Sequence, residues 1–267
     1  MLRNPVVAGQ FYPASKKQLI CEIEKHIDRE ASKEKILGIV SPHAGYMCSG
    51  ETAALTLSKA ELPNNIIILG PNHTGAGAGF SIMAHDAWKT PMDNVNINEK
   101  LAEIILSKTS LIKEDEEAHK YEHSIEVQLP IIQYLKSDFR FVPIAISYAD
   151  IEQYQEIGHA IAGAIEDFKE EVLIIASSDM THYESAETAK TKDNLAIESI
   201  LKLDEAELFS KVHKYNISMC GCGSVCIMLT ACKKLGAKDA ELVKYTNSGE
   251  VTGDFDQVVG YAGIIIK

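Results

Sequence analysis

One stretch, residues 66–75 (IIILGPNHTG), narrows the choice of fold more than any other. Its four leading apolar residues follow one another without a polar break, which predicts a strand buried on both faces of a sheet. Gly70 and Pro71 then end the strand, and His73 follows them directly. Because open α/β sheets bind their ligands beyond the carboxyl ends of parallel strands, His73 is a candidate site residue.

The same pattern occurs twice more along the chain. Residues 36–46 (ILGIVSPHAGY) place His43 after an apolar run, and residues 171–183 (EVLIIASSDMTHY) place His182 after another. For any one of these histidines alone, the competing interpretation is a helix cap or a buried core histidine. Three strands that each bring a histidine to the same edge of a sheet favour a site instead.

Strands and helical segments alternate throughout, which predicts a layered α/β domain. No linker, low-complexity segment or clear internal repeat divides the chain, so we expect one domain spanning residues 1–267. No apolar run approaches the roughly 20 residues of a membrane span. The first residues, MLRNPVVAGQFYPAS, lack the apolar region and cleavage site of a signal peptide, and we therefore expect a cytoplasmic location.

The net charge of −12 disfavours nucleic acid or an anionic membrane as the main partner, because phosphate groups are bound by basic surfaces. The six cysteines of a chain without a signal peptide are expected to be reduced thiols. No Cys-x-x-Cys pair occurs, so a structural zinc ribbon is not expected.

Other side chains could join the histidines at the predicted site. Cys220 and Cys222 lie in a turn before a predicted helix, whose N-terminus would favour the metal-binding thiolate; the alternative is a small buried apolar residue. Asp179 precedes His182 by three residues, so it can orient that imidazole or cap a helix. Cys48 follows His43 by five residues and can line the same pocket.

A helix is predicted over residues 122–135, where Pro130 should kink it or begin a new turn. His123 and Glu126 lie three residues apart near one face of this helix, as neighbours of the site or as capping groups. The remaining histidines are assigned to the surface: His26, His85, His119, His159 and His213.

Ordered blocks across nearly the whole chain match a known pattern: RNPVVAGQFYP at 3–13, SPHAGY at 41–46, LGPNH at 69–73, EHSIEVQLP at 122–130, SSDMTH at 177–182, MCG at 219–221 and SGEVTGDFDQVVGYAG at 248–263. In these blocks the chain resembles the Memo family, also called AmmeMemoRadiSam system protein B. The resemblance implies a fold similar to class III, non-haem iron extradiol dioxygenases. It therefore implies a single layered α/β/α domain with a mixed, largely buried central sheet.

The resemblance also implies which residues form the site. The family's metal ligands, two histidines and a cysteine, carry over to His43, His73 and Cys220. Its pocket histidine and aspartate match His182 and Asp179. A pocket aromatic of the family is matched conservatively by Phe11, whereas a pocket tyrosine of the family is replaced here by Cys48. The family name also suggests a link to a radical-SAM protein of the same system.

The resulting hypothesis is a metal-dependent redox or dioxygenase-like enzyme acting on a small molecule or a peptide group. It would bind one transition-metal ion, with iron(II) favoured and copper or zinc as alternatives, because a thiolate ligand softens the site. His182 would be the general acid–base, oriented by Asp179. The substrate pocket would be lined by Phe11, Cys48, His123 and Glu126.

Two other interpretations stay open. The same cleft could belong to a non-enzymatic module that binds a peptide or sequesters metal. Alternatively, zinc held by two histidines and a cysteine leaves a position for an activated water, which would make the protein a zinc hydrolase.

Overall fold

The computed structural model describes residues 2–267 and is organised around a large mixed sheet. The strands of this sheet are β2 (Gly38–Ser41), β3 (Asn65–Pro71), β4 (Phe80–Ile82), β7 (Lys113–Glu114), β8 (Arg140–Ile146), β9 (Val172–Ser177), β10 (His182–Glu184), β11 (Ala240–Asn247) and β12 (Val258–Ile266). Their order among the described residues is β10-β12-β2-β9-β3-β8-β4-β7, with β11 paired to β12. The central strands β2, β9, β3 and β8 are parallel, and the antiparallel strands β12 and β4 flank them.

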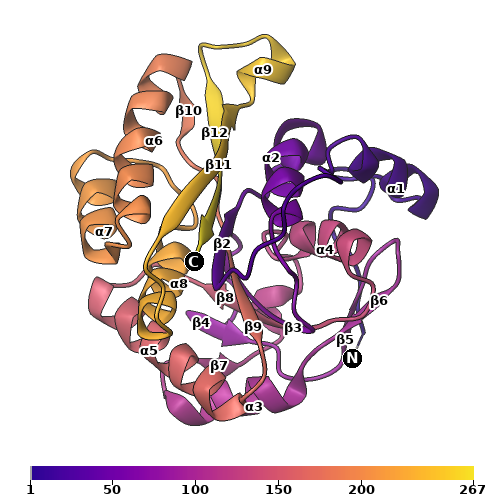
Figure 1. Cartoon of the computed structure of the whole chain (residues 1–267), viewed down its shortest axis with the longest axis vertical. Helices are drawn as coiled ribbons and strands as arrows, with labels where there is room; N and C mark the ends of the chain where they lie inside the picture. The colour runs from indigo at the N-terminus through magenta and orange to yellow at the C-terminus, as the bar shows by residue number, and fades with distance from the viewer. Residues whose placement is uncertain (1) are drawn as a thin grey trace.

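Helices cover both faces of the sheet, as Figure 1 shows. The helices are α1 (Lys16–Glu24), α2 (Tyr46–Ser58), α3 (Glu99–Lys108), α4 (Leu129–Leu135), α5 (Ile151–Phe168), α6 (Ala186–Leu201), α7 (Glu205–Lys214), α8 (Cys222–Lys234) and α9 (Gly249–Thr252), with 3₁₀ turns η1 (Glu117–His119) and η2 (Glu126–Gln128). Helices α1, α2 and α4 lie on one side, and α5, α7 and α8 lie on the other (Figure 1). A small second sheet consists of β1 (Leu2–Arg3), β5 (Ala87–Lys89) and β6 (Asn94–Asn96).

The apolar run of β3 shows why this arrangement forms. Ile67 and Leu69 enter the core beneath α5 and α8, whereas Ile66 and Ile68 enter the core beneath α2 and α4. Successive side chains of a strand point to opposite faces, so a strand covered on both faces has to be apolar at every position. The α/β/α fold with a mixed, largely buried central sheet that the sequence predicted is confirmed.

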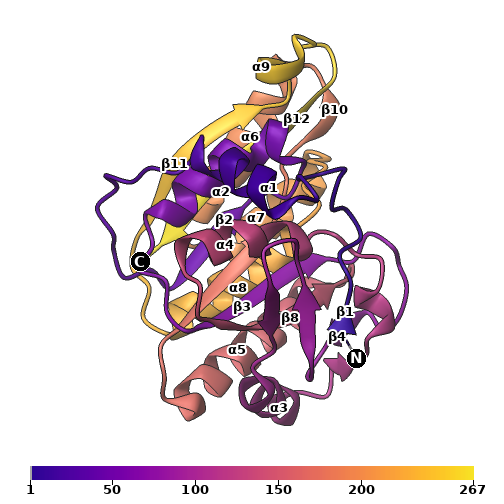
Figure 2. The same ribbon diagram turned by 90° about the vertical axis from the view of Figure 1, so that its right-hand side faces the viewer.

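The parallel centre of the sheet places the predicted site. Strands β2, β9 and β3 are neighbours, with Ser41 level with Ser177 and Leu69 level with Ala176. Their carboxyl ends therefore meet at one edge, and the segments that carry His43, Asp179 and His73 leave the sheet there. At one end of the molecule, β10, β12 and α9 project beyond the rest (Figure 2).

The helix predicted over residues 122–135 differs from the structure. The predicted helix over residues 122–135 is a 3₁₀ turn, η2, followed by the short helix α4, with Pro130 in the first turn of α4. A proline is tolerated there because its missing N–H would have no partner within the helix.

Among residues 2–267, no helix is both long enough and apolar enough to span a bilayer.

The assignment of His119 to the surface is wrong. This imidazole is fully buried, packs edge-on against Trp88, and its Nε2 donates to the carbonyl oxygen of Ser81 at 3.0 Å. Burial lowers its pKa to about 4, because the charged form loses its hydration, although the carbonyl of Ser81 works in the opposite direction. Nothing in the local sequence predicts this contact, which joins η1 to β4.

The low pKa of His119 predicts an acid-sensitive fold. The unfolded chain protonates this histidine near pH 6.5, but the folded chain does so only near pH 4, so stability should fall as pH decreases through that window. His119→Gln keeps a donor for Ser81 and removes the titration. Between pH 6.5 and pH 4, the variant should lose about 3 kcal/mol less unfolding free energy than the parent protein in urea titrations. Equal losses in the two proteins would contradict this account.

Candidate metal centre

His43 is held in one tautomer by a buried polar network. Its Nδ1 lies 2.9 Å from Ser177 Oγ, and that hydroxyl donates its own proton to the carbonyl oxygen of Ser124 at 2.7 Å. Gln128 Nε2 also donates to Ser177 Oγ at 2.9 Å, and Gln128 Oε1 is fixed because it accepts from Ser41 Oγ. Ser177 Oγ can therefore only accept from His43. The imidazole carries its proton on Nδ1 and keeps the lone pair on Nε2.

His73 is held in the same tautomer by a buried carboxylate. Its Nδ1 lies 2.9 Å from Glu122 Oε1, and its backbone N–H donates to Glu122 Oε2 at 2.6 Å. Burial alone would raise the pKa of Glu122, but hydrogen bonds from His73 and from the backbone of Ser124 outweigh it and lower the pKa to about 2. An ionised carboxylate accepts only, so His73 donates through Nδ1 and leaves Nε2 free.

Glu122→Gln should weaken metal binding while leaving the ligands in place. The amide can donate to His73 Nδ1 as well as accept from it, so the tautomer is no longer enforced. Loss of such a carboxylate behind a histidine ligand typically costs roughly 10–100-fold in metal affinity. Competition with a chromogenic chelator measures the affinity, and the exposed Glu117→Gln is the matched control. An affinity equal to that of the control would show that Glu122 does not orient a ligand.

His123 brings a third imidazole to the same point. One ligand nitrogen each from His43, His73 and His123 lie within 4.8 Å of one another. Donors bound at 2.0–2.1 Å to one ion lie at most about 4.2 Å apart, so a small side-chain adjustment brings all three into bonding range. The rings of His73 and His123 are stacked at 4.9 Å, and Phe11 meets His123 edge-on at 5.0 Å.

The surroundings of this cluster suit a transition-metal ion. Burial, together with the neighbouring imidazoles, lowers the pKa of His43 well below its usual value. Burial also lowers the pKa of His123, against the opposing effect of Glu122. These two imidazoles are therefore neutral at neutral pH. The neutral imidazole is the form that binds metal ions. His43 is buried and His123 half-buried, whereas the His73 side chain is 34% exposed, so the site is open to ligands on the His73 side.

Cys220 lies beside the cluster, immediately before α8. Its Sγ is 3.4 Å from His43 Nε2 and accepts from the backbone N–H of Asp179 at 3.3 Å. At this thiol, other effects outweigh the predicted influence of the helix N-terminus. Burial and the neighbouring carboxylate of Asp179 raise the pKa of the thiol above its usual range. Cys222, two residues on, is buried, and its thiol interacts with that of Cys226.

Asp179 and His182 are held differently from the prediction. Asp179 Oδ1 accepts from the backbone N–H of His43 at 2.8 Å, so this carboxylate secures the loop that carries a cluster histidine. The His182 ring is oriented instead by Ser218, whose carbonyl oxygen lies 2.9 Å from Nδ1. A carbonyl can only accept, so His182 Nδ1 donates and Nε2 is left with a free lone pair. His182 interacts electrostatically with both His43 and Asp179.

The residues predicted to line a substrate pocket separate into two groups. Phe11 packs on His123, and Cys48 hydrogen-bonds with Tyr261 and interacts electrostatically with Asp179, so both lie near the cluster. Glu126 does not face the cluster's ligand atoms. Its buried carboxylate pairs with Arg3 at 2.7 Å and accepts from the N–H groups of Val6 and Val7 and the hydroxyl of Tyr12. It anchors the N-terminal segment.

A cavity of about 480 Å³ reaches the cluster at His73 and Cys220. Its other walls come from the segment after β8, from Tyr154 on α5, from α7 and from the segment around Met219. Sequence analysis assigned Cys220 and Cys222 to the site, but none of the residues from the segment after β8, from α5 or from α7. The four predicted pocket residues, Phe11, Cys48, His123 and Glu126, are not among the described residues that line this cavity.

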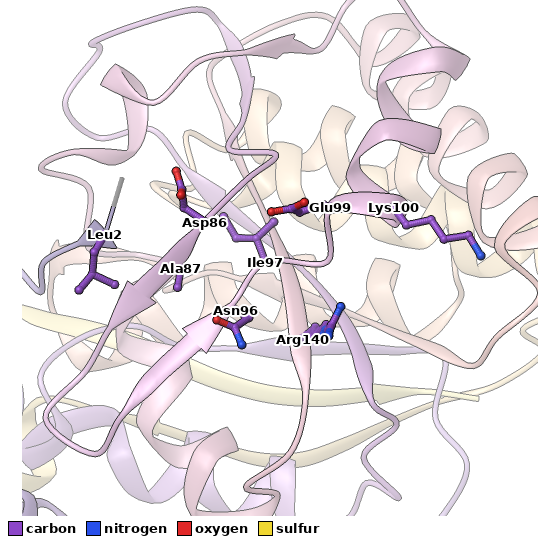
Figure 3. A pocket seen from close by; sticks show the side chains of 8 residues that line it. All are labelled: Leu2, Asp86, Ala87, Asn96, Ile97, Glu99, Lys100 and Arg140. Carbon is purple, nitrogen blue, oxygen red and sulfur yellow. The ribbon is translucent and has the colours of Figure 1, made fainter.

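A second cavity, of about 590 Å³, lies at the opposite edge of the sheet, where Arg140 begins β8 (Figure 3). Its walls carry charged side chains of both signs, including Glu99, Lys100 and Arg140 (Figure 3). Within residues 2–267, the three-histidine cluster is the sole grouping of three or more potential metal ligands with this spacing, and it does not border this cavity.

Comparisons with known proteins identify relatives of this chain over its full length. The family model described as Memo-like protein matches residues 3–265. A MEMO1 family protein from Methanosarcina mazei is 45% identical over all of this chain and 99% of its own length. A relative from Methanocaldococcus jannaschii is 42% identical, again over all of this chain and 99% of its own length. The crystal structure of an uncharacterized protein from Escherichia coli K12 superposes with a TM-score of 0.58 over 86% of this chain and 100% of that chain, at 12% identity, which supports the fold alone.

Proposed function

The chain belongs to the Memo-like protein family, and from that premise we propose that it is a metal-dependent enzyme of redox or dioxygenase-like type. Its substrate is a small molecule or a peptide group. The resemblance to extradiol dioxygenases favours iron(II), and the imidazole donors suit copper and zinc as well. A bound iron or copper ion would supply the electron-transfer chemistry that amino-acid side chains lack.

One observation carries this proposal: two of the clustered imidazoles are locked with Nδ1–H turned outward and Nε2 available. His43 is locked by Ser177 and His73 by Glu122. A core histidine needs no such arrangement on two separate strand ends, whereas histidine ligands are commonly held in this way by a hydrogen bond at the other ring nitrogen. We take His43 and His73 as ligands, and Cys220 and His123 as the candidates for the remaining position.

The chain's own residues would then have separate roles in positioning the ligands and in proton transfer. Asp179 fixes the backbone of His43, and Gln128 keeps Ser177 oriented towards its ring. His182 exchanges a proton with substrate through Nε2, because Ser218 holds its Nδ1 proton.

A zinc hydrolase is the second candidate, and a specific observation favours it. Three imidazoles around one point are a donor set found in catalytic zinc sites, where the fourth position holds water. Metal analysis of protein purified without oxygen separates the candidates. Iron or copper with substrate-dependent oxygen consumption supports the redox enzyme, and zinc at full occupancy with ester hydrolysis supports the hydrolase. Peptide binding that a chelator does not alter would instead support a binding module.

The choice of thiol ligand makes a separate prediction. Cys220 Sγ approaches His43 Nε2 at 3.4 Å, whereas the thiol of Cys222 is engaged with Cys226 one helical turn further on. Cys220→Ser should therefore lower metal affinity at least about tenfold, which is the lower end of the loss seen when a group that supports a metal ligand is removed. Cys222→Ser should bind metal as the parent protein does. Equal losses in both variants, measured by chelator competition, would refute the assignment, and the exposed Cys21→Ser controls for thiol removal in general.

A further inference from the structure

The cavity that reaches His73 and Cys220 has an uncharged lining. Of the described residues around it, none is a lysine, arginine, aspartate or glutamate. Most of its wall is apolar or aromatic, with Tyr154, Phe209, Val212, Ile217 and Met219 as the main side chains. The rings of Tyr154 and Phe209 meet edge-on at 6.1 Å. The cavity at Arg140, by contrast, is lined by charged side chains of both signs (Figure 3).

One polar group in this wall has no partner. Ser224 is 1% exposed, and its Oγ has no hydrogen-bond partner among the described residues. It lines the cavity from the first turn of α8. A buried hydroxyl without a partner is destabilising, so a ligand that hydrogen-bonds to it recovers that loss.

The nearby tyrosine does not satisfy Ser224. Tyr154 packs against Gly223, where an added Cβ would lie 2.6 Å from the ring. Its hydroxyl is already used, because it donates to the carbonyl oxygen of Ser147 at 3.1 Å and accepts from the N–H of Ala149 at 2.9 Å. The glycine therefore lets the tyrosine ring pack over the start of α8, while Ser224 Oγ stays without a partner.

The polar groups at the rim of the cavity are already paired with one another. The hydroxyl of Tyr148 lies 3.0 Å from His213 Nε2, and His213 Nδ1 donates to the carbonyl oxygen of Phe209 at 2.7 Å. Both ring nitrogens of His213 are thus engaged. A carboxylate or phosphate entering here would lose its hydration without gaining a lysine or arginine as a partner, which disfavours its binding.

We propose that this cavity is the substrate subsite, and that it takes an uncharged, ring-sized molecule whose hydroxyl or similar polar group hydrogen-bonds to Ser224 Oγ. Calling the ligand a substrate rests on the proposed function, but the selectivity for uncharged molecules rests on the cavity alone. The side chains of the cavity by themselves disfavour carboxylated and phosphorylated molecules.

A matched pair of probes tests this selectivity: 4-methylphenol and 4-hydroxybenzoate, which differ in carrying a methyl group or a carboxylate on the same ring. Binding is measured by calorimetry and ligand-observed NMR at pH 7.5, on chelator-treated protein, so that no metal can attract the carboxylate. We expect 4-methylphenol to bind at least about tenfold more tightly, the minimum for one unpaired charge. Equal affinities, tighter binding of the carboxylate, or binding of neither probe would overturn the proposal.

Two variants locate the binding site. Ser224→Ala should weaken 4-methylphenol about 3–10-fold, the worth of one hydrogen bond, whereas the exposed Ser110→Ala should change nothing. Tyr148→Lys places a cation at the exposed rim and should narrow the preference against 4-hydroxybenzoate. If neither variant alters binding, the probes bind elsewhere and the proposal fails.

The outcomes also separate this inference from the proposed function. Selective binding by chelator-treated protein, without any metal-dependent turnover, would support the cavity assignment and contradict the proposal that the protein is an enzyme. Metal-dependent turnover of an anionic substrate would support the enzyme and overturn the cavity assignment.

Discussion

His73→Ala is expected to reduce bound metal from one ion per chain to a small fraction of that, with at least about a 100-fold loss of affinity. Ligand loss should exceed the roughly 10–100-fold cost of losing a group that merely supports a ligand. His73 is the best choice for this test because its side chain is 34% exposed. Its removal should therefore leave the fold intact, unlike the removal of His43, which is tied into the buried network of Ser177 and Gln128.

The measurement is metal content by mass spectrometry after dialysis against a defined metal buffer. His159→Ala is the matched control, because His159 is exposed on α5 and makes no contribution to the cluster. Thermal unfolding of both metal-free variants should match that of the metal-free parent. Full metal occupancy in His73→Ala would mean that the three-histidine cluster is not the metal site.

The second large effect concerns His182, whose removal should separate catalysis from metal binding. His182→Ala is expected to retain the metal and to lower turnover by roughly 10²–10⁴, the usual contribution of a general acid–base. Its ring lies outside the three-histidine cluster, and Ser218 keeps Nε2 available for proton exchange. The rate is measured with whichever substrate the oxygen-consumption or ester screen identifies.

Asp179→Asn provides the comparison. The amide can still accept from the backbone N–H of His43, so turnover should fall less than in His182→Ala. Metal content is determined in the same samples. Loss of the metal from His182→Ala would make this histidine a ligand, and unchanged turnover would remove it from the mechanism.

The strand-end histidines could be predicted from sequence because their placement depends on local patterns. An apolar run followed by Gly-Pro or Ser-Pro determines both where a buried strand stops and what comes next. Parallel pairing then brings His43 and His73 to the same edge, although they belong to different strands. The recurring pattern was sufficient for this part of the site.

The supporting groups could not be predicted in the same way, because their contacts join distant segments. Glu122 meets His73 across 49 residues, and Ser218 meets His182 across 36. The signal for Glu122 was its place next to His123 in the block at 122–130, but its direction depends on how η2 packs behind β3. Asp179, which is close to His182 in sequence, instead accepts a hydrogen bond from the backbone N–H of His43.

Local rules also failed where burial outweighed them. A helix N-terminus lowers the pKa of an accessible thiol, but Cys220 is half-buried beside Asp179, and burial and that carboxylate both raise its pKa. His119 lies in a polar stretch that suggests the surface, yet it is enclosed by Trp88 and β4. The cavity was missed for a related reason, since its walls come from α5, α7 and the segment before α8, which meet only in the folded chain.

The most direct test of a metal centre at His43, His73 and His123 is anomalous scattering from crystals of the metal-loaded protein. The account predicts one peak per chain, at about 2.0–2.1 Å from the Nε2 atoms of His43 and His73. The third ligand, His123 or Cys220, would be seen in the same map. A peak elsewhere in the molecule, or no peak at this cluster in crystals grown with excess metal, would contradict it.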